Sequence, residues 1–351
     1  MTTSTTASLT EYRLQAQKNL HPDVWRYLDE PGDHANTHAL ARIKLMPRPL
    51  RKLSGGHTRL TLFGQTFDHP ILLAPVAYQK LFHPDGELAT AMAARAQGGQ
   101  MLISSLASHL FSDIVAYTRP GDAENDTVAA PWFQLYWQAD RAQTFALLER
   151  ALQAGCSAVV LTVDAPVKVA ALDLPSGVCA VNLMPVDAVT RSDNSVFNGL
   201  MTQAPTWVDV AWLRRQTHLP LLVKGLLHPD DAALAVDAGC DGMVVSNHGG
   251  RTLQAAPASV DCLAAVVRRV NGQVPVLFDS GIRSGQDVFA ALACGAAAVL
   301  LGRPYIWALA ATGPMGVANV IRLMRDELEM TMALTGCAHL SDIGQQCLAQ
   351  L

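Results

Sequence analysis

Eight short apolar segments recur through the chain, and stretches with helical spacing separate them. The intervening stretches are rich in alanine and leucine, as in "DDAALAVDAGC" and "GQDVFAALACGA". Strands that read as continuous apolar runs and alternate with helices are typical of a parallel sheet covered on both faces. Eight such units favour a closed (β/α)8 barrel, the TIM-barrel fold, over an open sheet. The segments are "ILLAP" (71–75), "MLISS" (101–105), "PWFQLYW" (131–137), "AVVLTVD" (158–164), "LPLLVKG" (219–225), "GMVVSN" (242–247), "VPVLFDSG" (274–281) and "AAVLLGRP" (297–304).

Two stretches of the chain support this assignment by resembling each other. "HPDDAALAVDAGCDGMVVS" and "SGQDVFAALACGAAAVLLG" both read as a helix, an Ala-Gly turn and a strand, and we interpret them as successive units of one barrel. The chain has 351 residues and is 50% hydrophobic, which suffices for a large core. Because α/β barrels often use about 250 residues as one unit, we expect a single domain over residues 1–351, with the barrel at approximately 66–335.

Two regions fall outside the expected barrel. Residues 1–65 carry helix-like segments at 9–19 and 23–29 and a proline-rich stretch, "MPRPLRKLSGG", so this region forms an N-terminal helical segment that packs across the barrel bottom or flanks its mouth. Residues 165–212 follow the fourth strand and are long and polar for a simple connection. Long loops after barrel strands are where lids lie, and we interpret 165–212 as a lid-like loop.

Composition excludes several classes of protein. A formal net charge of −4 and the lack of a Lys/Arg cluster argue against a nucleic-acid partner. The seven cysteines are scattered without CxxC or Cys/His spacing, which argues against a disulfide framework, and we expect no metal site. The N-terminal sequence is polar, unlike a signal peptide, and no run approaches the ~18 apolar residues of a membrane span. We therefore expect a soluble cytoplasmic protein without a membrane partner.

The segment "VVSNHGGRTL" (244–253) places an imidazole and a guanidinium directly after an expected strand. Val244 and Val245 read as the buried strand end, and the two glycines that follow His248 suit a tight exit with exposed backbone. In a barrel, the residues just after the strands line the face where function resides. A base, His248, delivered together with a permanent cation, Arg251, therefore indicates an active site.

The other strand ends carry a similar set of reactive and polar residues. "DSGIR" and "GRP" add backbone amides of glycine and two arginines after the seventh and eighth strands, where this fold often binds phosphate. The set comprises Pro75, Val76, Ala77, Ser104, Gln134, Tyr136, Thr162, Asp164, Lys224, Asp279, Gly281, Arg283, Gly302 and Arg303.

On these residues the chain resembles the FMN-dependent α-hydroxy acid oxidase and dehydrogenase family, which includes glycolate oxidase and lactate oxidase. "SNHGGR" is similar to the family's active-site signature. Further family-like blocks occur in family order along essentially the whole chain: "APVAYQKLFHPDGELATAMAA", "FQLYWQADR", "LTVDAP", "LPLLVKG", "FDSGIRSGQDVFAALACGAAAVLLGRP" and "MRDELEMTMALTGC".

The resemblance implies an FMN cofactor and assigns residues to it. Pro75, Val76 and Ala77 would lie against the flavin near N5, and Lys224 would stand beside N1 and O2, where a cation tunes the ring's electronics. Ser104, Gln134 and Thr162 would hydrogen-bond the polar edge of the ring. The ribityl phosphate would be held by Asp279, Gly281, Arg283, Gly302 and Arg303.

The resemblance also implies the catalytic and substrate-binding residues. His248 would be the base that removes the substrate proton, oriented by Asp164. Arg251 would hold the substrate carboxylate as a two-pronged donor, and Tyr27 and Tyr136 would hydrogen-bond its carboxylate or hydroxyl.

Two positions depart from the family pattern. Family members usually carry a second arginine seven residues after the strand-four aspartate, but here that position is Ala171, and Lys168 is the nearby cation. Losing one charged hydrogen bond to a carboxylate would cost about 1.5–3 kcal/mol. The loop is also shorter than usual. Three consequences are open: Lys168 substitutes as a less selective point charge, the shorter loop admits a substrate that is larger or depends less on its carboxylate, or turnover is poor. Gln254 stands where the family generally has an aspartate.

We therefore expect an FMN enzyme that oxidises an (S)-2-hydroxy acid, such as lactate, glycolate or mandelate, to the 2-oxo acid. Molecular oxygen, giving hydrogen peroxide, or another acceptor would reoxidise the flavin. The alternatives are an FMN-dependent isomerase on the same barrel and a non-catalytic flavoprotein with a degraded substrate clamp. The resemblance further implies a homotetramer.

Overall fold

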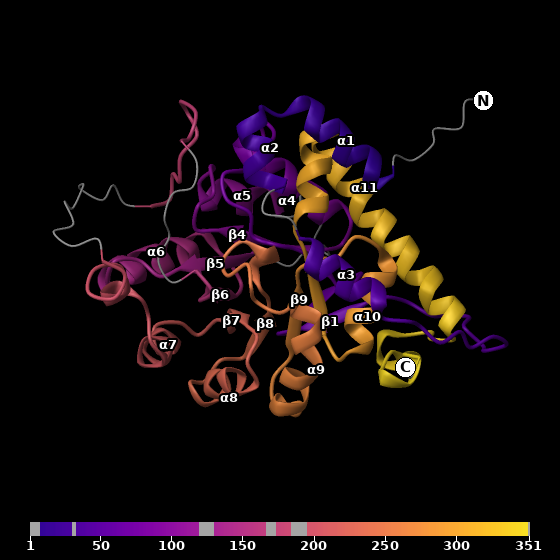
Figure 1. Cartoon of the computed structure of the whole chain (residues 1–351). Helices are drawn as coiled ribbons and strands as arrows, with labels where there is room; N and C mark the ends of the chain where they lie inside the picture. Colours follow the sequence, from indigo (N-terminus) through magenta and orange to yellow (C-terminus); the bar gives the residue numbers. More distant parts are fainter. Residues whose placement is uncertain (1–7, 30–32, 119–129, 166–172, 184–194, 350–351) are drawn as a thin grey trace.

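A closed barrel of eight parallel strands forms the centre of the molecule (Figure 1). The computed structural model describes residues 8–29, 33–118, 130–165, 173–183 and 195–349. All eight expected strands are present, and the barrel closes through pairing of the last strand with the first. The (β/α)8 fold predicted from the apolar runs is confirmed. The strands are β3 (Ile71–Leu73), β4 (Gln100–Ser104), β5 (Trp132–Tyr136), β6 (Val159–Thr162), β7 (Leu221–Leu226), β8 (Gly242–Val245), β9 (Val276–Asp279) and β10 (Ala298–Leu301).

The barrel interior changes from apolar to polar along each strand. One buried cluster fills the interior: Leu72, Leu102, Val160, Leu222, Val244, Leu277 and Leu300 are among its members. Because side chains two residues apart share a face of a strand, the next inward positions include Ser104, Thr162, Lys224, Ser246 and Asp279, all of them polar. The apolar core therefore ends in a polar layer at the carboxyl ends of the strands.

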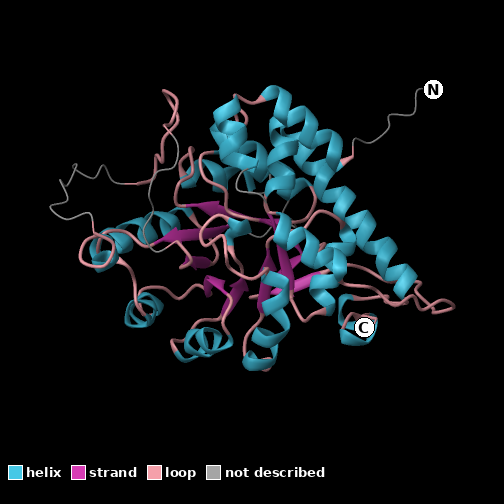
Figure 2. Ribbon diagram, in the orientation of Figure 1, coloured by secondary structure: helices cyan, strands magenta, loops and turns pink. Residues whose placement is uncertain are grey.

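A helix follows each barrel strand and covers the outside of the barrel (Figure 2). Residues of the opposite strand faces pack against these helices in a second, larger buried cluster. The helices are α4 (Gly86–Ala96), α5 (Phe111–Thr118), α6 (Arg141–Ala154), α7 (Trp207–Arg214), α8 (Pro229–Asp237), α9 (Ser259–Val270), α10 (Gly285–Ala293) and α11 (Arg303–Thr335). Short 3-10 turns lie at η1 (Gln79–Leu81), η2 (Leu200–Gln203), η3 (His248–Gly250), η4 (Leu340–Asp342) and η5 (Gln345–Cys347).

The predicted lid-like loop 165–212 ends earlier than expected. Thr206 and Asp209 form a reciprocal capping box, in which the Thr206 backbone N–H donates to Asp209 Oδ2 at 2.9 Å. This pattern starts a helix, so α7 begins at Trp207 within the predicted loop. Residues 166–172 and 184–194 of the loop lie outside the described residues.

Among the described residues, α11 alone is long and apolar enough to cross a membrane by length and composition. Its backbone leaves the helical conformation at Thr312 and Gly313, ahead of Pro314. The apolar window is 56% buried inside the fold, where α11 packs on α1, α4 and α10. The buried apolar residues of α11 therefore belong to the cluster between the strands and the surrounding helices.

The N-terminal region contributes to both ends of the barrel. Helices α1 (Leu9–Asn19) and α2 (Pro22–Asp29) match the expected segments, and α1 lies along α11 (Figure 1). A third helix, α3 (His34–Arg42), packs on α9 and α10. An unexpected hairpin, β1 (Leu60–Leu62) and β2 (Gln65–Phe67), closes the barrel bottom, because Leu62 and Phe67 join the interior cluster.

Candidate active site

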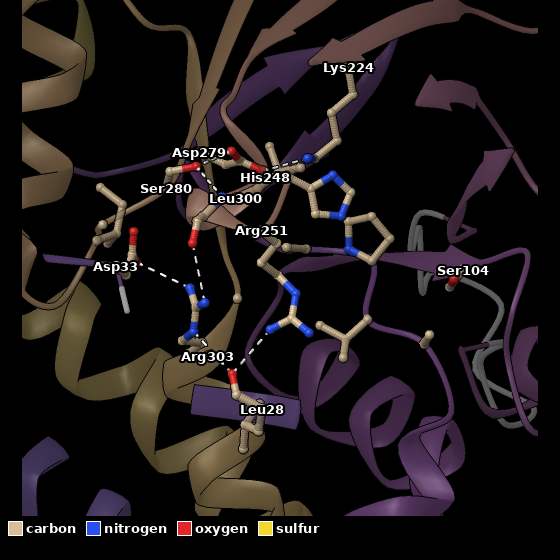
Figure 3. A pocket seen from close by; sticks show the side chains of 18 of the residues that line it. Leu28, Asp33, Ser104, Lys224, His248, Arg251, Asp279, Ser280, Leu300 and Arg303 are labelled. Carbon is tan, nitrogen blue, oxygen red and sulfur yellow. Dashed lines mark hydrogen bonds and ion pairs between the residues drawn. The ribbon is translucent and has the colours of Figure 1, made fainter. Parts of the chain in front are cut away.

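A pocket of about 910 Å³, including open solvent at its mouth, lies over the carboxyl ends of the strands (Figure 3). Most of the predicted site residues line it: Tyr27, Pro75, Val76, Ala77, Ser104, Tyr136, Lys224, His248, Arg251, Asp279, Gly281, Arg283, Gly302 and Arg303. The remaining three, Gln134, Thr162 and Asp164, lie behind this lining. Gln134 Oε1 accepts from Ser104 at 3.1 Å, Thr162 pairs with Lys224 in the sheet register, and Asp164 contacts His248. The structure therefore brings the whole predicted set together.

His248 lies between a carboxylate and a phenol. Its Nδ1 is 2.8 Å from Asp164 Oδ1, and its Nε2 is 3.4 Å from the Tyr136 hydroxyl. A carboxylate can only accept, so the Asp164 contact places the ring proton on Nδ1 and leaves the lone pair of Nε2 facing the pocket. The predicted pairing of His248 with Asp164 is thus present in the geometry.

The electrostatics of the site favour a neutral imidazole and an ionised carboxylate. Burial, helped by the charge of Lys224, lowers the pKa of His248, although Asp164 acts in the opposite direction. Burial alone would raise the pKa of Asp164, but Lys224 and the hydrogen bond from His248 outweigh it, so that pKa is lowered. Burial raises the pKa of Tyr136 far above its ordinary value, which keeps its phenol protonated.

Lys224 forms a buried ion pair at the floor of the pocket. Its Nζ lies 2.9 Å from Asp279 Oδ2 and donates to Ser246 Oγ at 2.9 Å. Burial would lower the pKa of Lys224, but the charges of Asp279 and Asp164 outweigh burial and raise it. Lys224 therefore keeps a fixed positive charge beneath the pocket.

Backbone carbonyls of the N-terminal helix α2 hold Arg251 in place. One guanidinium nitrogen donates to Tyr27 O at 2.7 Å and another to Leu28 O at 3.4 Å. The guanidinium also lies over the Tyr27 ring, 4.9 Å from its centroid. Because guanidinium has five N–H donors in a planar fork, Arg251 retains donors for a carboxylate in the pocket.

The two arginines expected at the phosphate share a carboxylate that the sequence analysis missed. Asp33 Oδ2 lies 3.0 Å from Arg283 and 3.4 Å from Arg303, and its side chain is buried. Burial lowers the pKa of Arg303 to about 10 despite the opposing effect of Asp33. Gly281, at φ +89°, allows the chain to pass Asn36, since an added Cβ would lie 2.8 Å from the Asn36 backbone.

The pocket fits the FMN that the sequence resemblance implies. Gln134 Nε2 and Thr162 Oγ1 are buried and have no hydrogen-bond partner in the described structure. Buried polar atoms are normally paired, and these two lie on the inward strand faces, where the polar edge of a flavin would satisfy them. At the opposite side, Gly302 and Arg303 begin α11, and a helix N-terminus with two arginines suits a phosphate.

Of the two positions that depart from the family pattern, one lies outside the described residues and the other is exposed. Lys168 and Ala171 lie outside the described residues. Gln254 is exposed in the turn that follows the active-site segment.

Comparisons with known proteins find relatives over nearly the whole chain. The chain matches the family described as FMN-dependent dehydrogenase over residues 16–350. It is 45% identical to an L-lactate oxidase of Roseobacter sp. (strain GAI101), covering 96% of this chain and 93% of that protein. It is 43% identical to a 4-hydroxymandelate oxidase of Amycolatopsis orientalis, over 86% and 85%. A solved mandelate oxidase with (S)-2-phenylpropionate superimposes with a TM-score of 0.85 at 38% identity, covering 97% of both chains.

Proposed function

The chain belongs to the FMN-dependent dehydrogenase family, and from this premise we propose that it oxidises an (S)-2-hydroxy acid to the 2-oxo acid, with oxygen as the final acceptor and hydrogen peroxide as the second product. The observation that carries this proposal is the contact between His248 and Asp164 beside Arg251, above the buried Lys224. When bound, FMN accepts the two electrons removed from the substrate.

His248 performs the proton transfer. Nε2 accepts a proton from the substrate, because Nδ1 already donates to Asp164. The resulting imidazolium is stabilised by the ionised Asp164 at 2.8 Å. The Tyr136 hydroxyl stands on the Nε2 side of the ring, where it donates a hydrogen bond to the bound acid.

Arg251 anchors the substrate. Its fixed guanidinium binds the carboxylate of the hydroxy acid, which places the α-carbon between Arg251 and His248. The carbonyls of Tyr27 and Leu28 prevent the long side chain from turning away. The aromatic face of Tyr27 covers the guanidinium and excludes water from one side of it.

Anaerobic stopped-flow mixing tests the reaction. The experiment compares the (S)-enantiomers of lactate and mandelate with glycolate. We expect at least one of these acids to bleach the flavin absorbance. The (R)-enantiomers are the matched controls, which should bleach it far more slowly. An aerobic assay should detect hydrogen peroxide and the 2-oxo acid in equal amounts. A flavin that stays oxidised with every 2-hydroxy acid would refute the proposal, and substrate conversion under air without formation of an oxidised product would favour an isomerase.

We further propose that the enzyme is a cytoplasmic homotetramer. All seven cysteines are free, which suits a reducing compartment. Met315, Met330 and Leu334 expose apolar surface along α11, which suits contact with another copy. Light scattering after size-exclusion chromatography measures the assembly, and a monomeric mass would contradict this part of the proposal.

A further inference from the structure

The turn that carries His248 has an unusual set of supports. His248 itself adopts a left-handed conformation, with φ +57°, and Gly249 follows with φ +63°. Three successive amides of the turn donate to side-chain oxygens: His248 N to Ser246 Oγ at 3.0 Å, Gly249 N to Ser280 Oγ at 3.0 Å, and Gly250 N to Asn247 Oδ1 at 3.2 Å. Ser246 and Asn247 belong to the same loop as the turn. Of these three acceptors, Ser280 is the one that comes from another strand end.

Ser280 makes its contact with the turn from a strained backbone conformation. Its φ is +87°, a conformation that a residue with a Cβ rarely adopts and that costs conformational energy. Strain of this kind persists where the surroundings demand it and is concentrated at functional sites. The Ser280 hydroxyl donates to Asp279 Oδ1 at 2.8 Å and accepts from Gly249 N, so one side chain joins two strand-end loops.

The Gly249 peptide is held from both sides. Its N–H donates to Ser280, and its carbonyl accepts from an Arg303 guanidinium nitrogen at 3.2 Å. Asp279, to which Ser280 donates, also pairs with Lys224. A continuous chain of contacts therefore runs from the buried lysine, through Asp279 and Ser280, to the backbone next to His248.

We propose that Ser280 is a positioning residue for proton transfer, whose hydroxyl fixes the His248 turn relative to the Asp279–Lys224 pair. This inference rests on the proposed function, because it assigns Ser280 to the same reaction. The Ser280 hydroxyl positions the turn, and the backbone strain at Ser280 has no part in this role. Without the hydroxyl the Gly249 amide loses its partner, and His248 samples orientations in which Nε2 is turned from the substrate.

Two substitutions separate the hydroxyl from the strain. Ser280→Gly removes the hydroxyl and relieves the strain, because glycine adopts positive φ freely. Ser280→Ala removes the same hydroxyl and retains the Cβ. We expect Ser280→Gly to unfold at a higher temperature than Ser280→Ala. We expect both to bleach the flavin about tenfold more slowly than the wild type at saturating substrate, a factor equivalent to about 1.4 kcal/mol of barrier. The substrate concentration that gives half-maximal bleaching should change little, because α2 holds Arg251 independently.

Hydrogen–deuterium exchange supplies a readout that needs no turnover. Measured on protein without added FMN, exchange in a peptide that spans residues 245–251 should accelerate in both variants. Ser284→Ala is the matched control, because Ser284 lies in the same loop and caps α10 without touching the turn. It should lose stability with unchanged bleaching and unchanged exchange at 245–251.

The outcomes distinguish this inference from the proposed function. If none of the hydroxy acids bleaches the wild-type flavin, the proposed function is refuted. Hydrogen–deuterium exchange then still tests the link between Ser280 and the turn. A wild type that bleaches while Ser280→Gly bleaches equally fast overturns the positioning role. Unchanged exchange at 245–251 in both variants overturns the contact itself.

Discussion

Replacing Lys224 by methionine should leave the Asp279 carboxylate without its ion-pair partner inside the barrel. The Lys224 ammonium is 2.9 Å from Asp279, and their side chains are only 5% and 9% exposed. Breaking a buried ion pair by removing one partner costs about 3–5 kcal/mol of stability. Protonation of the carboxyl that remains in the variant sets an upper limit on this loss of stability. Neutralising a carboxyl with an ordinary aspartic acid pKa of about 3.9 costs about 1.4 kcal/mol for each of the roughly three pH units up to pH 7, or about 4 kcal/mol. We expect Lys224→Met to lose about 3–4 kcal/mol at pH 7.

The loss should depend on pH in a defined direction. The pKa of Lys224 is raised, so the wild-type ammonium stays charged across pH 5.5–7. In the variant, the folded state takes up a proton that the unfolded chain does not bind in this range, so the folded state gains stability as the pH falls. The deficit should therefore shrink by up to about 2 kcal/mol between pH 7 and pH 5.5.

Urea unfolding of the FMN-free protein measures this deficit without the added stability of a bound ligand. The matched control is the double variant Lys224→Met with Asp279→Asn, which removes both charges and should recover part of the loss. A single variant as stable as the wild type at pH 7, or a deficit that does not change with pH, would refute the reasoning about the buried pair.

Three further predictions concern the reaction. His248→Gln should retain the yellow flavin and slow bleaching by about 10²–10⁴-fold, the usual contribution of a general base; bleaching within tenfold of the wild type would exclude His248 as the base. Because burial and Lys224 lower the pKa of His248, kcat/KM should fall only below the ordinary histidine pKa of about 6.5 as the pH decreases. Asp164→Asn should shift this fall in kcat/KM to still lower pH. A fall that begins above pH 7 in the wild type would contradict the assignment of His248 as the base. Arg251→Met should lower kcat/KM by about 10- to 150-fold, equivalent to the 1.5–3 kcal/mol of a charged hydrogen bond, and should weaken inhibition by a 2-oxo acid equally; intact inhibition would show that the carboxylate binds elsewhere.

The barrel and the strand-end residues were predictable because both depend on local sequence. Buried parallel strands need continuous apolar runs, and the polar residue two positions after an inward apolar one marks the strand end, as Val160 and Thr162 or Leu222 and Lys224 show. By contrast, each strand of the hairpin 60–67 has three residues, too few for a periodic pattern to stand out.

The residues that hold the site residues in place could not be predicted from the sequence in the same way. Asp33 meets Arg283 and Arg303 across most of the chain, and no local pattern marks that contact. Ser280 lies within the quoted segment "DSGIR", but its left-handed backbone and its contact with Gly249 appear only in three dimensions. A serine between an aspartate and a glycine at a strand end is the one available signal, since glycine would fit that conformation without strain.

The carbonyl of Leu28 receives hydrogen bonds from both Arg251 and Arg303. During synthesis Leu28 leaves the ribosome before both of its guanidinium partners, which follow it 223 and 275 residues later in the chain. The hydrogen bonds that join the expected substrate anchor, Arg251, and the expected phosphate-binding Arg303 to one carbonyl therefore form only after Arg303 has emerged. We expect FMN to bind after this point of synthesis, because Arg303 belongs to the expected phosphate site.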